Sequence, residues 1–152
     1  MAQVYSVTSG KTAGAAAGSV KGAVALATGA QVRAAIIQID ITLNGINAAA
    51  KPVLVELVKT TTAPSGGSAY TPLKNRAGGR DAQTTARIND TTDGSSPTIQ
   101  QGYLVPATSG VIQQIPLGRE IELGVSEFWE VRVTWASAET VTDYLVNVWF
   151  EE

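Results

Sequence analysis

Alternation of apolar and polar side chains is the feature that most constrains how this chain can fold. In segment 37–43, Ile37, Ile39, Ile41 and Leu43 alternate with polar residues, and segment 129–135 alternates in the same way. Successive side chains of a β-strand point to opposite faces of its sheet. Each segment therefore predicts a strand with one buried face and one wet face.

Further short strands are predicted between Gly- and Pro-rich turns. Val, Ile and Thr together make up 43 of the 152 residues, and these branched side chains pack well on a pleated surface. No segment has the period of an amphipathic helix. We therefore predict an all-β protein, a jelly-roll-like β-sandwich with an extended N-terminal arm. Strands are expected at 53–60, 69–73, 84–88, 98–105, 111–115, 120–123 and 144–150, the first forming a hairpin with 37–43.

The domain boundaries follow from where this strand pattern is interrupted. Four glycines recur every fourth residue at positions 10, 14, 18 and 22, which predicts an arm over 1–30 with at most a short strand at 23–27. Residues 31–152 are expected to form a single β-sandwich domain, with a long loop-rich segment at 59–101. Strand 144–150 is apolar on both faces for part of its length, so it packs centrally in the sandwich or faces a second chain.

The sequence excludes several classes of chemistry. It contains no Cys and no His, which removes disulfides, thiol nucleophiles, the Ser-His-Asp triad and ordinary zinc sites. Residues 9–12 (SGKT) match the end of a phosphate-binding loop, but Tyr5 stands where that loop needs its first Gly. We therefore expect no enzyme activity, no catalytic residue, no cofactor and no metal.

Charge is unevenly distributed along the chain. The net charge is −2, but residues 1–89 hold nine Lys and Arg against three Asp and Glu, whereas 90–152 hold two against ten. Two halves of opposite charge either mix on one folded surface, pair with other copies, or direct one half toward a charged partner. We expect no nucleic-acid partner from this balance. No apolar stretch reaches 18 residues and no secretory signal is present, so no membrane association is expected.

Candidate contact residues come from basic and aromatic side chains. Arg76, Arg80 and Arg87, with Lys74, form a loose basic cluster around Gly78-Gly79 in the loop-rich segment. The cluster is interpreted either as a mobile loop able to meet an acidic surface or as plain solubilising charge. Lys11 and Lys21 lie in the predicted arm. Trp129, Trp135 and Trp149, together with Tyr144, are interpreted as core or interface residues, with a sugar-stacking platform as the alternative. Trp149 is the aromatic candidate for a contact with a partner protein or a second subunit.

The C-terminal third resembles a known family. Segments 102–110 (GYLVPATSG), 116–120 (PLGRE), 131–134 (VRVT) and 150–152 (FEE) resemble small β-rich capsid decoration (cement, auxiliary) proteins of tailed bacteriophages. The resemblance implies a jelly-roll or related sandwich, a homotrimer, and a seat on the outer surface of the major capsid protein shell. Production in the host cytoplasm and a place on the capsid exterior of the virion follow from that role. The alternative function is a sugar-binding or fibre-type β module of a phage virion.

Overall fold

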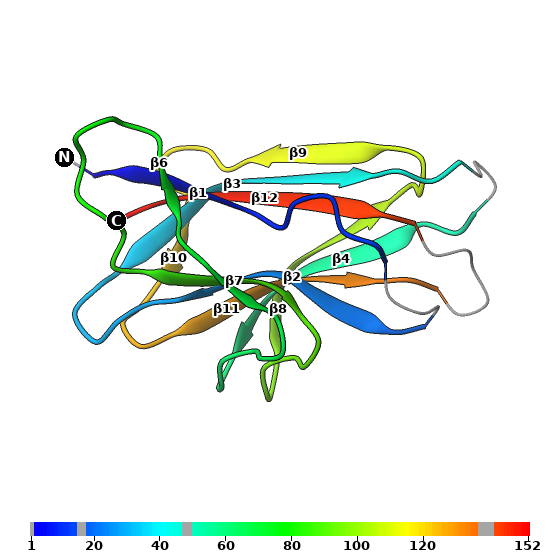
Figure 1. Cartoon of the computed structure of the whole chain (residues 1–152), viewed down its shortest axis with the longest axis horizontal. Coiled ribbons are helices and arrows are strands. Elements are labelled where there is room, and N and C mark those ends of the chain that lie inside the picture. Colours follow the sequence, from blue (N-terminus) through cyan, green and yellow to red (C-terminus); the bar gives the residue numbers. More distant parts are fainter. Residues whose placement is uncertain (1, 15–17, 47–49, 137–141) are drawn as a thin grey trace.

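Two antiparallel β-sheets pack face to face in the computed structural model, which describes residues 2–14, 18–46, 50–136 and 142–152 (Figure 1). These residues form twelve strands and no helix. The prediction of an all-β sandwich is therefore confirmed. None of the described segments is a helix that could cross a bilayer.

Sheet A lies uppermost in Figure 1 and has the strand order β10-β3-β12-β1-β6, with β9 pairing beside β10 on the same edge of β3. Its last strand in the sequence, β12, lies between β3 and β1. The strands are β1 (Val4–Thr8), β3 (Ala34–Leu43), β6 (Leu73–Lys74), β9 (Gly110–Gln114), β10 (Ile121–Leu123) and β12 (Tyr144–Glu151).

Sheet B forms the lower layer with the strand order β5-β7-β2-β11-β4-β8. Its central strands are β2 and β11. Among the described residues, β5 and β8 are its edge strands. The strands are β2 (Val20–Ala27), β4 (Val53–Thr60), β5 (Ser68–Tyr70), β7 (Thr85–Asp90), β8 (Thr98–Val105) and β11 (Phe128–Thr134).

The core fills the space between the two sheets. Its largest side chains include Trp135, Tyr5, Tyr144 and Phe150, each no more than 1% exposed. Tyr5 and Phe150 stack with ring centroids 5.4 Å apart, which joins neighbouring strands of sheet A through an aromatic pair. The interpretation of Trp135 and Tyr144 as core residues is confirmed, and Trp129, at 4% exposure, is buried with them.

Most strands that follow one another in the sequence lie in different sheets. Within the described residues, no strand pairs with the one that follows it in the sequence. The predicted hairpin between 37–43 and 53–60 is therefore wrong, because β3 belongs to sheet A and β4 to sheet B. Gly45 follows β3 without forming a tight hairpin turn: its N–H donates to Ala107 O at 2.8 Å, and a Cβ there would lie 2.4 Å from that oxygen.

The prediction of an arm over 1–30 differs from the structure, because β1 and β2 are integral strands of the two sheets. The glycines act through turns and close packing. Gly10 and Gly18 have φ of 66° and 77°, values that redirect the chain and suit glycine best. Gly22 lies inside β2, where a Cβ would come within 2.1 Å of the Glu130 carboxylate.

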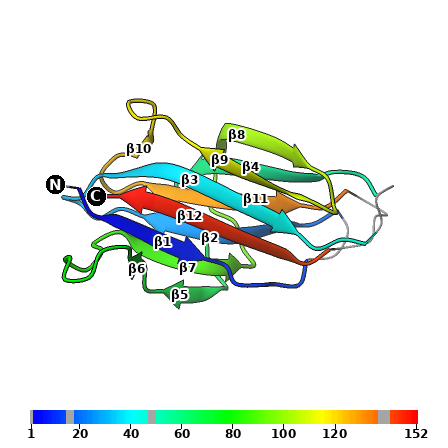
Figure 2. The same cartoon turned by 90° about the horizontal axis from the view of Figure 1, so that it is seen from above.

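The loop-rich segment 59–101 extends both sheets along one side. Within it, β6 adds to β1 in sheet A, while β7 adds to β2 in sheet B and carries β5 outside it. The short strand expected at 84–88 occurs as β7, whereas the one expected at 69–73 is divided between β5 in sheet B and β6 in sheet A. Because each sheet contains strands from both halves of the sequence, the basic and acidic halves share one folded surface (Figure 2).

Candidate functional site

The loop between β6 and β7 carries three of the predicted contact residues. We call residues 74–81 the basic loop; it lies at the end of the sandwich that holds both chain termini (Figures 1 and 2). Lys74 Nζ lies 2.8 Å from Asp81 Oδ1 and donates to Gly79 O at 3.1 Å. A hydrogen bond and the nearby charge of Lys74 hold the pKa of Asp81 below its usual value. One positive charge of the loop is therefore already matched.

A second anchor ties the basic loop to the core. The buried Tyr5 side chain donates its O–H to Arg80 O at 3.0 Å. Arg76 and Arg80 both remain exposed on the loop. The structure thus differs from the expected mobile loop, because hydrogen bonds at both its ends fix its path and present two arginines beyond the sheet end.

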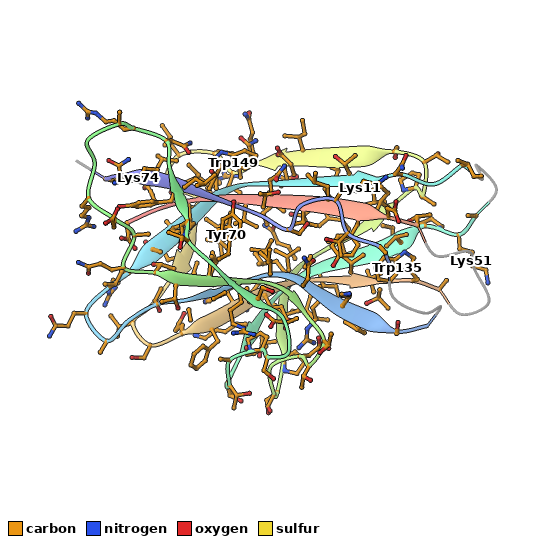
Figure 3. All side chains as sticks on the ribbon, in the orientation of Figure 1. Lys11, Lys51, Tyr70, Lys74, Trp135 and Trp149 are labelled. Atoms are coloured by element: carbon orange, nitrogen blue, oxygen red, sulfur yellow. The ribbon has the colours of Figure 1, made fainter. Side chains whose placement is uncertain are left out.

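Lys11 and Lys21 lie away from the basic loop. Lys11 follows β1 toward the opposite end from Lys74 (Figure 3) and its Nζ lies 3.2 Å from Asp143 Oδ2. Lys21 belongs to β2 in sheet B, where it pairs with Val133. The predicted basic contacts therefore do not form one patch: Lys74, Arg76 and Arg80 come together, while Lys11 and Lys21 are separate.

Trp149 occupies a hollow on the outer face of sheet A, away from Trp135 (Figure 3). On its two neighbouring strands it is paired with Ser6 and Gln38. The hollow has a volume of about 800 Å³. We call it the Trp149 hollow, and its lining is Val4, Ile37, Gln38, Asn75, Gln114, Ile115, Pro116, Leu117, Trp149 and Glu151.

A β-bulge in β3 shapes this hollow. Trp149 pairs with Gln38 and Phe150 with Ile36, so Ile37 is an extra residue on β3. A bulge lets adjacent side chains leave the usual alternation, and here both Ile37 and Gln38 line the hollow. Ile115 N–H donates to Ile37 O at 2.9 Å, which attaches the wall of the hollow at the bulge. Alternation predicted Ile37 on the buried face, and the structure corrects this.

Some of the polar groups that line the hollow already form hydrogen bonds with protein side chains. Gln114 Nε2 donates to Gln38 Oε1 at 3.3 Å, and Gln38 Nε2 donates to Asp40 Oδ1 at 2.9 Å. The indole N–H groups of Trp129 and Trp135 donate to Glu127 and Thr142. By contrast, the Trp149 indole N–H has no hydrogen-bond partner among the residues that the structure describes. The hollow therefore presents a free donor beside oriented amides.

A buried ionic cluster on the outer face of sheet B was not predicted. Arg132 Nε lies 3.0 Å from Glu130 Oε2 and 3.8 Å from Asp93 Oδ2, and Arg132 also donates to Gly94 O at 3.0 Å. Glu130 is 1% exposed. Its burial raises its pKa to about 7, against the opposing hydrogen bond and charge of Arg132.

Asp90 continues this cluster on β7. Arg87 Nε and Gly67 N–H both donate to Asp90 Oδ1, at 3.0 and 2.9 Å. Two buried oxygens, Asp90 Oδ2 and Glu130 Oε1, have no hydrogen-bond partner in the described part of the chain. Alternation alone predicted Glu130 and Arg132 on a wet face, because it carried no information about the segment around Gly94 that covers them.

The residues that resemble a phosphate-binding loop join sheet A instead. Ser9 N–H donates to Val146 O and Thr12 N–H to Tyr144 O, each at 2.9 Å. Ser9 and Thr12 therefore both attach to β12, and the chain turns between them at Gly10, whose φ is 66°. The described residues also contain no cluster of three or more acidic, His or Cys side chains that could hold a metal ion.

Comparisons were made with protein-family models, with curated proteins and with solved structures. None of the three found a match to this chain.

Proposed function

We propose that the protein is a structural, non-enzymatic decoration protein of a tailed-bacteriophage capsid. It binds the outer surface of the major capsid protein shell as a homotrimer and stabilises that shell. On this proposal it is made in the host cytoplasm and becomes part of the virion exterior.

The order of the strands is the observation that carries this proposal. Leaving out β5–β7 and β10, the remaining strands run β1-β12-β3-β9 in sheet A and β2-β11-β4-β8 in sheet B. In this set of eight antiparallel strands, chain neighbours lie in opposite sheets except β4 and β8, which pair in sheet B. This order supports a jelly roll, an architecture used by viral capsid domains and lectins. The strand order supports the resemblance of segments 102–152 to decoration proteins.

The basic loop is the proposed contact with the shell. Arg76 and Arg80 are exposed at one end of the sandwich, and the Tyr5 and Lys74 anchors reduce the ordering cost of presenting them. An acidic capsid surface is the complementary partner. Lys74 contributes by holding the loop, since its charge is paired with Asp81.

The proposed trimer draws support from the edge strand β8. Ile99 and Leu104 on this strand are 60% and 72% exposed. Exposed apolar side chains on a sheet edge favour contact with another chain. Three linked contacts raise the effective concentration of each, so weak individual contacts suffice for firm attachment to a shell.

Co-sedimentation with undecorated capsids tests the proposal. The wild type should bind at about 0.1 M salt and lose binding as salt approaches 1 M, since the screening length falls from ~10 Å to ~3 Å. The Arg76→Ala/Arg80→Ala double variant should bind weakly at low salt. Arg119→Ala, which removes an exposed arginine outside the basic loop, is the matched control and should bind like wild type.

Two results would contradict this assignment. Binding that is independent of salt and unchanged in the double variant would remove the basic loop from the interface. Failure of the wild type to bind any phage capsid, with a monomer seen by light scattering at micromolar concentration, would remove the decoration function.

A further inference from the structure

We propose that the Trp149 hollow binds a neutral carbohydrate. This activity goes beyond shell attachment and does not depend on it. Shell attachment uses Arg76 and Arg80, whereas the basic loop contributes Asn75 to the lining of the hollow, so either activity can fail without the other.

The hollow has the size and composition of a ligand site. Its volume of about 800 Å³ falls within the range of roughly 300–1,000 Å³ that is common for small-molecule sites. Such sites combine apolar and aromatic surface with a few oriented polar groups. Trp149, which is half-buried, supplies the aromatic surface, and its neighbour on β1 is the small residue Ser6.

The polar groups match hydroxyl chemistry. A sugar hydroxyl both donates and accepts, and an amide side chain offers both functions on one group. Gln38, Gln114 and Asn75 contribute three such amides. The bond from Gln114 to Gln38 orients two of them in advance. The unpartnered Trp149 N–H adds a donor that a ligand oxygen would satisfy.

The charge of the lining selects a neutral ligand. Glu151 is the charged residue among the described side chains that line the hollow, and no Lys or Arg lines it. A phosphate, a nucleotide or an acidic sugar would meet a carboxylate without a compensating cation. A carboxylate accepts hydrogen bonds from neutral hydroxyls without that penalty.

The surroundings favour a sugar over a protein partner. Beside the hollow, the outer face of sheet A carries the polar residues Thr8, Asp40, Thr42 and Asn147. Its apolar residues there include Leu145, opposite Thr42, and Ile112, which lies opposite Asp40 and is 68% exposed. A stable protein interface needs about 800 Å² on each partner with an apolar centre, and these two side chains are interspersed among polar ones. Leu117, 93% exposed, lies on the rim, where it adds a contact for the apolar side of a sugar ring.

A glycan array that carries neutral and acidic glycans identifies the ligand for the full chain, and titration calorimetry with the best neutral oligosaccharide measures its affinity. Acrylamide quenching of fluorescence reports on the site, because Trp129 and Trp135 are buried and Trp149 is accessible. We expect the bound sugar to protect Trp149 from the quencher.

Variants assign the binding to the hollow. Trp149→Ala should weaken binding at least tenfold, Trp149→Phe less, and Gln114→Ala about fivefold, which is the equivalent of one hydrogen bond. Leu145→Ala is the matched control: it lies on the same face of β12, outside the hollow, and should bind like wild type. Arg76→Ala/Arg80→Ala should also keep full sugar affinity, which separates this site from shell attachment.

Several results would overturn the proposal. One is that the protein binds no neutral glycan on the array. Others are that it prefers acidic glycans, or that a bound sugar leaves Trp149 open to the quencher. If Trp149→Ala does not fold, as judged by thermal melting, Trp149→Phe and Gln114→Ala decide the case, and wild-type affinity in both would place the sugar elsewhere.

Discussion

Replacing Glu130 with Gln should remove a large part of the pH dependence of stability between about pH 4.5 and 7. Burial raises the pKa of Glu130 from 4.5 to about 7 in the folded protein. Its carboxyl group lies among Asp90, Asp93, Arg87 and Arg132. In this cluster the carboxyl groups outnumber the two arginines, so a proton on Glu130 reduces the excess of negative charge.

The direction of the effect follows from comparing the folded and unfolded states. The folded state holds the proton more tightly, so the stabilisation is complete below the unfolded pKa of 4.5 and is lost as the pH rises through about 7. Each unit of difference in pKa corresponds to about 1.4 kcal/mol, so the free energy of unfolding should fall by about 3 kcal/mol across this window. Glu56, opposite Arg132 on β4, also faces the cluster.

Another carboxylate acts in a lower pH range. Burial raises the pKa of Glu127, but hydrogen bonds from Lys59, Trp129 and the Gly124 N–H outweigh burial and lower it overall. The stability from Glu127 is present above its ordinary pKa of 4.5 and is lost as the pH falls. Loss of stability on raising the pH above 4.5 therefore reports on Glu130 and not on Glu127.

Urea unfolding at several pH values measures the effect. Glu130→Gln mimics the protonated form. Its free energy of unfolding should therefore match that of wild type near pH 4.5 and exceed it by up to about 3 kcal/mol at pH 8. Glu122→Gln, which removes an exposed carboxylate on β10, is the matched control. It should lose as much stability as wild type when the pH is raised. An equal loss in wild type and Glu130→Gln would refute the reasoning.

Three further predictions concern packing and the N-terminal strands. Gly22→Ala should lower the free energy of unfolding by about 1–3 kcal/mol, because its Cβ would meet a buried carboxylate oxygen at 2.1 Å; Gly102→Ala, with nothing within 4 Å, should cost much less in the same denaturant assay. Tyr5→Phe should cost about 1 kcal/mol and speed hydrogen exchange in the basic loop, and unchanged exchange would show that this anchor does not hold it. A truncated chain of residues 31–152 lacks β1 and the central strand β2, so circular dichroism should show no cooperative melting; a cooperative transition would mean that these strands are dispensable.

The positions of the strands could be predicted from the sequence, but their pairing could not. Segments 53–60 and 98–105 match β4 and β8 residue for residue, because turn residues bound each one. Pairing is non-local: β12 lies between β1 and β3, far away in the sequence. Local patterns therefore suggested a hairpin that does not exist. The glycine repeat also suggested an arm, because the sequence alone does not distinguish glycines required for close packing from glycines of a flexible segment.

The candidate sites depended on features that alternation does not contain. The pattern of 144–150 left open whether Trp149 faced the core or the outside, and the structure places it outside. The hollow further requires the bulge at Ile37, which breaks the period that predicted this residue as buried. Glu130 is buried because a distant segment covers an outward face. Such burial depends on tertiary contacts, which the strand pattern does not encode.

Cysteine footprinting on the capsid tests the decoration proposal most directly. The chain contains no Cys, so a single Ala77→Cys in the basic loop or Thr108→Cys in the exposed turn before β9 gives one reactive thiol. If the basic loop faces the shell, adding undecorated capsids should slow maleimide labelling at position 77 at least tenfold and leave position 108 unchanged. Unchanged labelling at position 77 in capsid-bound protein, or protection at position 108 alone, would contradict the account.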